Sequence, residues 1–329
     1  MNIPTAPVKN HTTGEFHPRS RHRSSYAFSE LCAHSPTLAR YIRPHPRSGG
    51  PAIDYNDPVA VKELNRALLL CHYGLTTWDL PEGFLCPPVP SRADYLHYAA
   101  DLLASDGAAL TLGARSALSV LDIGTGANCI FPLIGRSLYG WRFVGTDAHR
   151  TSLDWAQRLV DSNAGMPGPD IELRFQPSPD AVFRHVVTSS DRFALSVCNP
   201  PFYASEEEAE RESITRIRPA LDDTDTPHRR AFGGIGRELW CEGGEVVFIR
   251  RMIMESALFS ENCVWFTTLV SRAGNLPAIE KSLATAGVHA RRTHTMFAGQ
   301  KQTRMLAWTF LPEEERRARL SPRLIGDRA

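Results

Sequence analysis

Short apolar runs alternate with helical patterns along this chain from about residue 117 onward. Five of the runs have the length and composition of strands, and they read ALSVLDIG, WRFVGTDA, IELRFQ, RFALSVCN and NCVWFTTLVS. Repeated alternation of strand and helix is typical of a parallel sheet, because the connecting helices cover both of its faces. We therefore predict an α/β fold built on a mostly parallel sheet.

Two more strands are expected after these five. The helical pattern LPAIEKSLATAG ends in a glycine, and the runs HARRTHTMFA and RMLAWTFL follow it. The linker GQKQT between the two runs is short enough for a hairpin. This pair would add antiparallel strands to the sheet and give it seven strands in all.

The N-terminal part is expected to be a helical appendage, residues 51–110, preceded by an arm. In DPVAVKELNRALLLCHYG, Asp57 is placed as an N-cap and Gly74 as a terminator, and a second helix is expected from about 91 to 105. Residues 1–50 are rich in Pro, His, Arg and Ser, so they read as an arm that orders partly or only on a partner. The sheet domain would span 111–312, and 313–329 would form a solvated tail.

Positive charge is concentrated in the N-terminal arm. The composition, 42% hydrophobic and 22% charged, is that of an ordinary soluble globular protein, and a net charge of +1 gives no overall attraction to polyanions. Residues 1–50 nevertheless carry seven Lys or Arg against two Asp or Glu. Arg19, Arg21 and Arg23 therefore belong either to a solvated tail or to an arm that contacts RNA phosphates.

Cysteine usage and hydropathy exclude several classes of protein. The seven cysteines are widely spread and form no C-x-x-C pair, which argues against a disulfide framework and against structural zinc. No apolar stretch has the length of a membrane span, and the first residues do not resemble a signal peptide. We expect a cytoplasmic protein that binds no metal and no membrane.

A glycine-rich turn, VLDIGTGANC, follows the first of the five strands. Gly124 and Gly126 would let backbone amides approach a ligand at the start of a helix. Cys129 stands where a dinucleotide-binding motif has its third glycine, which favours a nucleoside ligand such as S-adenosylmethionine (SAM) over NAD. Asp147 ends the next strand, where a carboxylate can bind ribose hydroxyls, and it lies twenty-five residues after Asp122. The alternative is a plain strand-to-helix turn with a capping aspartate.

The fourth strand ends at Asn199-Pro200-Pro201-Phe202, where two prolines prevent both helix and strand from continuing. The amino group of adenine is a poor nucleophile because its lone pair is delocalised into the ring. The Asn199 side-chain carbonyl and the Pro200 backbone carbonyl can accept its two hydrogens, while Pro201 fixes the geometry and Phe202 stacks on a flipped base. The alternative is a structural proline turn.

Two further features have open interpretations. Arg92, in PPVPSRADYLHYAADLL, is either a surface arginine at a helix start or the partner of the carboxylate in the methionine moiety of SAM. The acidic segment 206–230 lacks the periodicity of a core element, so it is either a flexible loop or a lid over the substrate.

With these motifs in register, the chain resembles class I SAM-dependent methyltransferases, and more closely the RlmF-type adenine-N6 methyltransferases of large-subunit (23S) ribosomal RNA. The blocks that carry the resemblance cover most of residues 17–310 and include LNRALLLCHYGLTTWDLPEGFLCPPVPSRADYLHYAADLL, CNPPFYAS, FGGIGRELWCEGGEVVFIRRMI and GQKQTRMLAWTF. The resemblance implies a Rossmann-like methyltransferase domain and SAM contacts at these positions: Arg92, Gly124, Asn128, Asp147, Asn199 and, near the adenine, Gln176. We expect Asp122 and Gly126, from the strand end and the glycine-rich turn, to belong to the SAM site as well.

The leading hypothesis is transfer of a methyl group from SAM to the N6 atom of one adenine in 23S ribosomal RNA. N5-methylation of a protein glutamine is the alternative within enzymes, since a planar amide presents the same chemical problem. A SAM-dependent RNA-binding protein, similar to the related small-nuclear-RNA methyltransferases, is the alternative outside them. The basic arm and the extended blocks favour RNA, and no DNA partner is expected.

Overall fold

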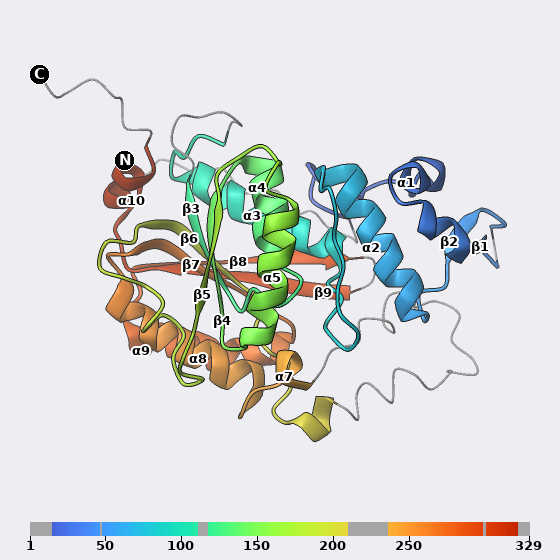
Figure 1. Cartoon of the computed structure of the whole chain (residues 1–329). Helices are drawn as coiled ribbons and strands as arrows, with labels where there is room; N and C mark the ends of the chain where they lie inside the picture. Colours follow the sequence, from blue (N-terminus) through green and yellow to red (C-terminus); the bar gives the residue numbers. More distant parts are fainter. Residues whose placement is uncertain (1–14, 47, 111–117, 210–235, 299–300, 322–329) are drawn as a thin grey trace, which may run out of the picture.

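One seven-stranded sheet organises the structure, a computed structural model that describes residues 15–46, 48–110, 118–209, 236–298 and 301–321 (Figure 1). The strands of the sheet are β3 (Ser119–Ile123), β4 (Arg142–Asp147), β5 (Ile171–Phe175), β6 (Phe193–Cys198), β7 (Cys263–Val270), β8 (Ala290–Ala298) and β9 (Lys301–Thr309). Their order is β5-β4-β3-β6-β7-β9-β8.

The strand directions confirm the expected fold class. Strands β5, β4, β3, β6 and β7 are parallel, whereas β9 runs antiparallel to β7 and pairs with β8 as a hairpin. The chain leaves β3 toward β4 and β5 on one side and returns to β6 on the other, so the sheet has its topological switch point between β3 and β6. Ligands of open α/β sheets bind beyond the carboxyl ends of the strands at such a point.

Helices cover both faces of the sheet, as the alternating sequence pattern predicts (Figure 1). One face carries α3 (Val89–Ser105), α4 (Ile130–Tyr139) and α5 (Arg150–Ser162), and the other carries α8 (Gly244–Ser256) and α9 (Leu276–Ala286). All residues of β6 and β7 are buried, so these two strands form the centre of the core. In the described part of the chain, none of the helices combines the length and apolarity needed to cross a membrane.

The N-terminal helices form as their end signals predict. Helix α2 (Pro58–Tyr73) begins where the Asp57 carboxylate accepts a hydrogen bond from the Val59 amide at 2.9 Å, and it ends at Gly74, whose φ is +67°. Helix α3 begins two residues earlier than expected. These caps satisfy amides and carbonyls that lack intrahelical partners.

The N-terminal segment 15–46 is more ordered than the sequence suggests. It contains α1 (Phe28–His34), the 3₁₀ helix η1 (Pro36–Tyr41) and β1 (Ile42–Pro44), which pairs with β2 (Pro51–Ile53). His17 is buried, and its backbone amide donates to the Asp94 carboxylate of α3 at 2.8 Å. His22 is buried as well and bonds the Tyr73 hydroxyl at 2.8 Å. Polar bonds to α2 and α3 hold the start of this segment, and Phe28, Leu31 and Leu38 bury their side chains in the hydrophobic core.

The expectation of a solvated tail is wrong for its first part. Helix α10 (Glu313–Leu320) buries Arg316 and Leu320. The Arg316 guanidinium donates to the Asp106 carboxylate at 2.8 and 3.2 Å, and the Trp265 indole donates to the same carboxylate at 2.7 Å. Charged residues dominate α10, so its composition hides one fully buried ion pair. The last residues of the expected tail, 322–329, lie outside the described residues.

Candidate active site

The glycine-rich turn lies at the carboxyl end of β3. Gly124 and Gly126 have φ values of +71° and +63°, in the left-handed region that favours glycine. The amides of Gly124 and Thr125 both donate to the Thr146 carbonyl of β4 at 2.9 Å, which ties the turn to the neighbouring strand. A Cβ atom on Gly124 would meet nothing within 4 Å. The backbone at Gly124 can therefore be approached closely by a ligand.

Asp147 lies at the carboxyl end of β4, where the sequence predicts it. Its two carboxylate oxygens accept hydrogen bonds from the Gly126 amide at 2.9 Å and the His149 amide at 2.8 Å. Burial raises the pKa of the Asp147 carboxyl above its ordinary value. The residue thus holds the glycine turn in place, a role that the sequence analysis did not anticipate and that is compatible with binding ribose hydroxyls.

Arg92 is buried in the first turn of α3, so the interpretation as a surface arginine is wrong. Its guanidinium lies over the Phe131 ring, 5.9 Å from the ring centroid, and burial lowers its pKa to about 10. Among the described residues it forms no ion pair with a carboxylate. The nearby Asp122 charge acts on the pKa of Arg92 without a direct ion pair, so the buried guanidinium can still pair with an anionic group of a ligand.

Asp122, at the end of β3, is the second buried charged group near the turn. It is 1% exposed, and neither of its oxygens has a hydrogen-bond partner within the described ranges. Burial is the main cause that raises the pKa of Asp122 to about 7, with a smaller contribution from the Asp147 charge, while the nearby Thr125 hydroxyl and the Arg92 guanidinium oppose the rise. A carboxyl group in this state is available to accept a hydrogen bond from a donor that enters the site.

Asn128 and Gln176 both use their side-chain amides inside the protein. The Asn128 oxygen accepts from the Ile130 amide at 3.1 Å and so caps the start of α4. The Gln176 amide donates to the Arg184 carbonyl at 2.9 Å and accepts from the Ser178 amide at 3.1 Å. Gln176 lies beside Asp147, because its backbone amide donates to the Asp147 carbonyl at 2.8 Å. Gln176 therefore shapes the loop after β5.

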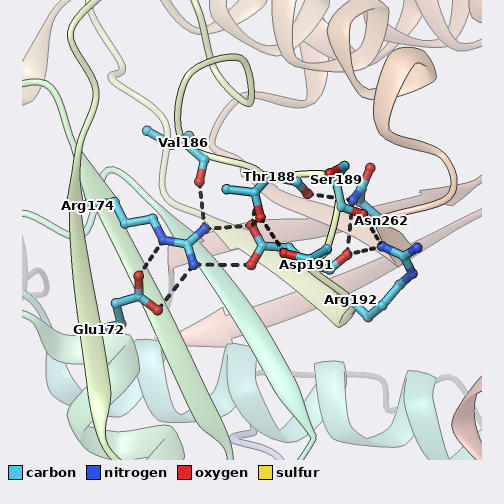
Figure 2. A network of polar contacts seen from close by, with 9 residues as sticks. Glu172, Arg174, Val186, Thr188, Ser189, Asp191, Arg192 and Asn262 are labelled. Carbon is cyan, nitrogen blue, oxygen red and sulfur yellow. Dashed lines mark hydrogen bonds and ion pairs between the residues drawn. The ribbon is translucent and has the colours of Figure 1, made fainter.

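A dense polar network fixes the far end of the same loop (Figure 2). Arg174 of β5 donates to both oxygens of Asp191, at 2.6 and 3.1 Å, and to the Val186 carbonyl at 2.8 Å. Asn262, the residue before β7 in the sequence, donates to the Thr188 and Asp191 carbonyls, both at 3.0 Å. These bonds anchor the connection from β5 to β6 and hold the segment that begins at Gln176.

The segment Asn199-Pro200-Pro201-Phe202 leaves β6 at the same edge of the sheet. The amides of Phe202 and Tyr203 donate to the Leu239 carbonyl at 2.9 and 3.0 Å, so the turn is held from outside the sheet. The side-chain oxygen of Asn199 is buried and has no hydrogen-bond partner among the described residues. An unpaired buried acceptor is costly in a finished core, and it is expected where a donor is to be bound.

Glu238 is a residue of this region that the sequence analysis missed. It belongs to the short helix α7 (Gly236–Leu239), and its carboxylate accepts from the Leu85 amide at 2.8 Å. Burial, with a contribution from the Asp147 charge, raises the pKa of Glu238 to about 7. Its only signal in the sequence is its place in the block FGGIGRELWCEGG. Most of the expected loop or lid, residues 210–230, lies outside the described residues.

The three arginines of the N-terminal segment form no hydrogen bond to the candidate SAM-site or proline-segment residues in the described part of the chain. Arg19 pairs with Asp101 at 2.7 Å and donates to the His97 carbonyl at 2.8 Å. Arg21 lies over the Tyr73 ring, 5.9 Å from its centroid, and Arg23 is 3.6 Å from Glu15. Arg19 and Arg23 keep 41% and 49% of their side chains exposed, so they can also contact a partner.

The site fits SAM on observations of this structure. It combines an open glycine turn, a buried guanidinium, two buried carboxyls with raised pKa values and an unpaired amide oxygen. The open glycine turn can accommodate the nucleoside of SAM, and the guanidinium can pair with its carboxylate. The two carboxyls and the amide oxygen can accept hydrogen bonds or lie near its cationic groups. In the part of the chain that the structure describes, no three His, Cys, Asp or Glu residues are grouped so as to hold a metal ion. All seven cysteines are free thiols.

Comparison with known proteins gives a consistent result. A family model described as RNA methyltransferase matches residues 10–312. The ribosomal RNA large subunit methyltransferase F of Cronobacter sakazakii is 48% identical over 301 residues, which cover 91% of this chain and 95% of that protein. The enzyme of the same name from Pseudomonas aeruginosa is 45% identical over 323 residues, 97% of this chain and 95% of that protein.

Solved structures are similar over almost the same extent. The catalytic domain of hMettl16 in complex with hairpin 1 of the MAT2A 3′UTR has a TM-score of 0.75 and 26% identity, over 90% of this chain and 96% of that one. The N-terminal domain of human METTL16 in complex with SAH has a TM-score of 0.71 at 24% identity, over 91% of this chain and 100% of that one. This second likeness concerns the fold alone.

Proposed function

Because the chain belongs to the RNA methyltransferase family and, within it, to the ribosomal RNA large subunit methyltransferases F, we propose that it methylates the N6 atom of one adenine in 23S ribosomal RNA. The family match supports RNA as the substrate, and the observation that supports transfer to an amino nitrogen is the buried, unpaired side-chain oxygen of Asn199 at the end of β6. It is an acceptor fixed in position before any substrate arrives.

The Asn199 oxygen and the Pro200 carbonyl accept the two hydrogens of the adenine amino group. This arrangement withdraws the nitrogen lone pair from the ring and directs it outward, and it needs no prior deprotonation. When bound, SAM supplies an electrophilic methyl group on its sulfonium. Pro201 keeps the turn rigid, and the half-buried Phe202 offers a stacking surface for the flipped base. The bond from N6 to the methyl carbon forms as the carbon–sulfur bond breaks, S-adenosylhomocysteine leaves, and N6 releases one proton to water.

We assign the methyl donor to the groups around the glycine turn. Arg92 binds the carboxylate of the methionine moiety, and Asp147 binds the ribose hydroxyls. Asp122 and Asn128 border the same space, and Gly124 and Gly126 allow close approach of the backbone. Gln176 bounds the adenine side through the loop that it shapes. The bacterial relatives and the free thiols support a cytoplasmic location.

The N-terminal segment supplies RNA contacts that are independent of sequence. Arg19, Arg21 and Arg23 follow one another on a segment packed against α2 and α3, and phosphate contacts of this kind fix the position of an RNA without reading its bases.

Mass spectrometric mapping of N6-methyladenosine in ribosomal RNA, from cells with and without the protein, tests the proposal. One adenine of 23S ribosomal RNA should lose its methyl group when the protein is absent and regain it when the wild-type gene is restored. The Asn199→Ala variant should not restore it. Unchanged adenine methylation, together with loss of N5-methylglutamine from a cellular protein, would overturn the proposal in favour of a glutamine methyltransferase.

A further inference from the structure

The end of β6 is held by hydroxyl groups in a way that regular sheet pairing does not require. On one side β6 pairs with β3 as far as Cys198 opposite Ile123, but on the other it pairs with β7 only as far as Ser196 opposite Phe266, although β7 continues to Val270 beside β9. Beyond this point the Cys198 amide donates to the hydroxyl of Tyr95 on α3, at 3.3 Å. Cys198 is the residue before Asn199.

The hydrogen bonds around Tyr95 form a closed chain with a defined direction. Thr267 of β7 donates its only hydroxyl proton to the Ser196 carbonyl at 2.7 Å. The Tyr95 hydroxyl, 2.6 Å from the Thr267 oxygen, must therefore be the donor in that bond. The series of hydrogen bonds runs from the Cys198 amide through the Tyr95 and Thr267 hydroxyls to the Ser196 carbonyl, so it holds both ends of the last three residues of β6.

This chain is isolated from water and rigid. Tyr95, Thr267 and Ser196 are each 0% exposed. The Tyr95 ring packs edge-on against Phe131, with centroids 5.2 Å apart, and the Arg92 guanidinium lies over the same Phe131. Tyr95 is one turn after Arg92 on α3. The hydroxyl thus connects the helix assigned to the methyl donor with the strand end assigned to the adenine.

We propose that Tyr95 is a positioning residue for methyl transfer: its hydroxyl fixes the end of β6 and thereby the place of the Asn199 oxygen relative to the donor bound at Arg92. The inference rests on the proposed function. Tyr95 touches neither substrate. A displacement of about 1 Å in a catalytic group can slow a reaction on the order of a hundredfold, so one bond to the preceding amide is enough to matter.

Tyr95→Phe removes only the hydroxyl and tests the proposal. The single-turnover methylation rate at saturating SAM and RNA should fall about ten- to a hundredfold, with SAM affinity by calorimetry unchanged within about twofold. Ser256→Ala is the matched control, because it removes a buried hydroxyl that accepts from the Trp308 indole at 2.9 Å, at a place with no hydrogen bond to the site residues. It should lower the melting temperature similarly and leave the rate intact.

Thr267 gives a second pair of variants if Tyr95→Phe folds poorly. Thr267→Val breaks the same chain at its next link and should slow the reaction, whereas Thr267→Ser keeps the hydroxyl and should restore the rate. A full rate in Tyr95→Phe would overturn the proposal. Equal losses of rate and SAM affinity would also overturn it, since Tyr95 would then act on the donor site alone.

Hydrogen exchange separates this inference from the proposed function. The Cys198 amide should exchange at least about tenfold faster in Tyr95→Phe than in the wild type, whatever substrate the enzyme uses. If the wild type leaves ribosomal RNA unmethylated, the proposed function fails while this measurement still stands. If the wild type methylates ribosomal RNA and Cys198 exchange is unaltered, the hydroxyl chain is the part that fails.

Discussion

The side-chain oxygen of Asn199 is central to the proposed chemistry, because it is buried without a partner among the described residues, whereas the Phe202 and Tyr203 amides that follow are bonded to the Leu239 carbonyl. Such an atom is costly in a folded protein unless a ligand uses it. At the residue scale, the site consists of several such groups: the Arg92 guanidinium, the two Asp122 oxygens and the Asn199 oxygen.

Asn199→Ala should reduce the single-turnover methylation rate by about a hundredfold or more, because it removes one preorganised acceptor. Asn199→Asp should keep partial activity, since a carboxylate can still accept from the amino group. RNA affinity should change little in both variants, because phosphate contacts provide most of it. A near-normal rate in Asn199→Ala, measured with saturating RNA, would show that the segment Asn199-Pro200-Pro201-Phe202 is a structural turn without a catalytic role.

Asp147→Ala should weaken SAM binding roughly ten- to a hundredfold, since it removes charge-assisted hydrogen bonds worth on the order of 1.5 to 3 kcal/mol. Part of that loss will come from the glycine turn, whose Gly126 amide loses its acceptor. Calorimetry measures the affinity, and exposed Asp154 of α5 provides the control Asp154→Ala. Equal affinities in the two variants would contradict the assignment of Asp147.

At the scale of elements, the N-terminal segment and α10 each join parts of the chain that lie far apart in sequence. His17 bonds Asp94 on α3, and Arg316 of α10 bonds Asp106 just after the same helix. Both segments look solvated in the sequence because polar and charged residues dominate them, although Leu31, Leu38 and Leu320 are buried in the hydrophobic core.

Replacing Arg19, Arg21 and Arg23 together with Ala should weaken RNA binding. The salt dependence should flatten by up to about 2 units of slope, at roughly 0.7 per phosphate contact for single strands. The structure adds a stability cost, since Arg19 is bonded to Asp101 and His97. Titrations at several salt concentrations measure both quantities, with exposed Arg158→Ala as control. If the salt dependence of RNA binding is unaltered in the triple variant, the N-terminal segment is not part of the RNA interface.

Arg316→Met should lower the free energy of unfolding by about 3 to 5 kcal/mol, because it leaves the buried Asp106 carboxylate with an uncompensated charge. The side chains of this pair are only 4% and 2% exposed. Arg317→Met on the same helix removes a 60% exposed partner of Glu313 and should cost less than about 1 kcal/mol. Urea denaturation gives both values, and equal losses would show that α10 contributes by packing alone.

At the scale of the whole molecule, the fold class followed from the sequence because strand length, helix length and their alternation are local properties. The hairpin of β8 and β9 was recognised for the same reason. The burial of Arg92 could not be predicted from the sequence, since a charged residue at a helix start is usually exposed. Its burial depends on tertiary packing, in which the guanidinium lies over the Phe131 ring. The closed hydroxyl chain of Tyr95 joins three elements, and no spacing along the sequence encodes it.

Stability should depend on pH through Asp122. Its pKa in the folded protein is about 7, against 3.8 for an ordinary aspartate, so the unfolded chain ionises first. The contribution of Asp122 to the stability of the wild type therefore falls as pH rises from about 4 to 7, by up to about 1.4 kcal/mol per pH unit. The Asp122→Asn variant does not show this fall in stability, because its side chain does not ionise. Its stability relative to the wild type should grow over that range in urea denaturation, while a constant difference would mean that Asp122 is already ionised at low pH.

The pair of Asp106 and Arg316 also sets an order of events during synthesis. A ribosome completes Asp106 long before Arg316, 210 residues later, leaves the exit tunnel. Until then the nascent sheet domain can close around Asp106 only by burying a carboxylate whose charge is uncompensated. Helix α10 therefore completes a core that the earlier elements have already formed in part, and the domain reaches its final stability only after α10 has been translated.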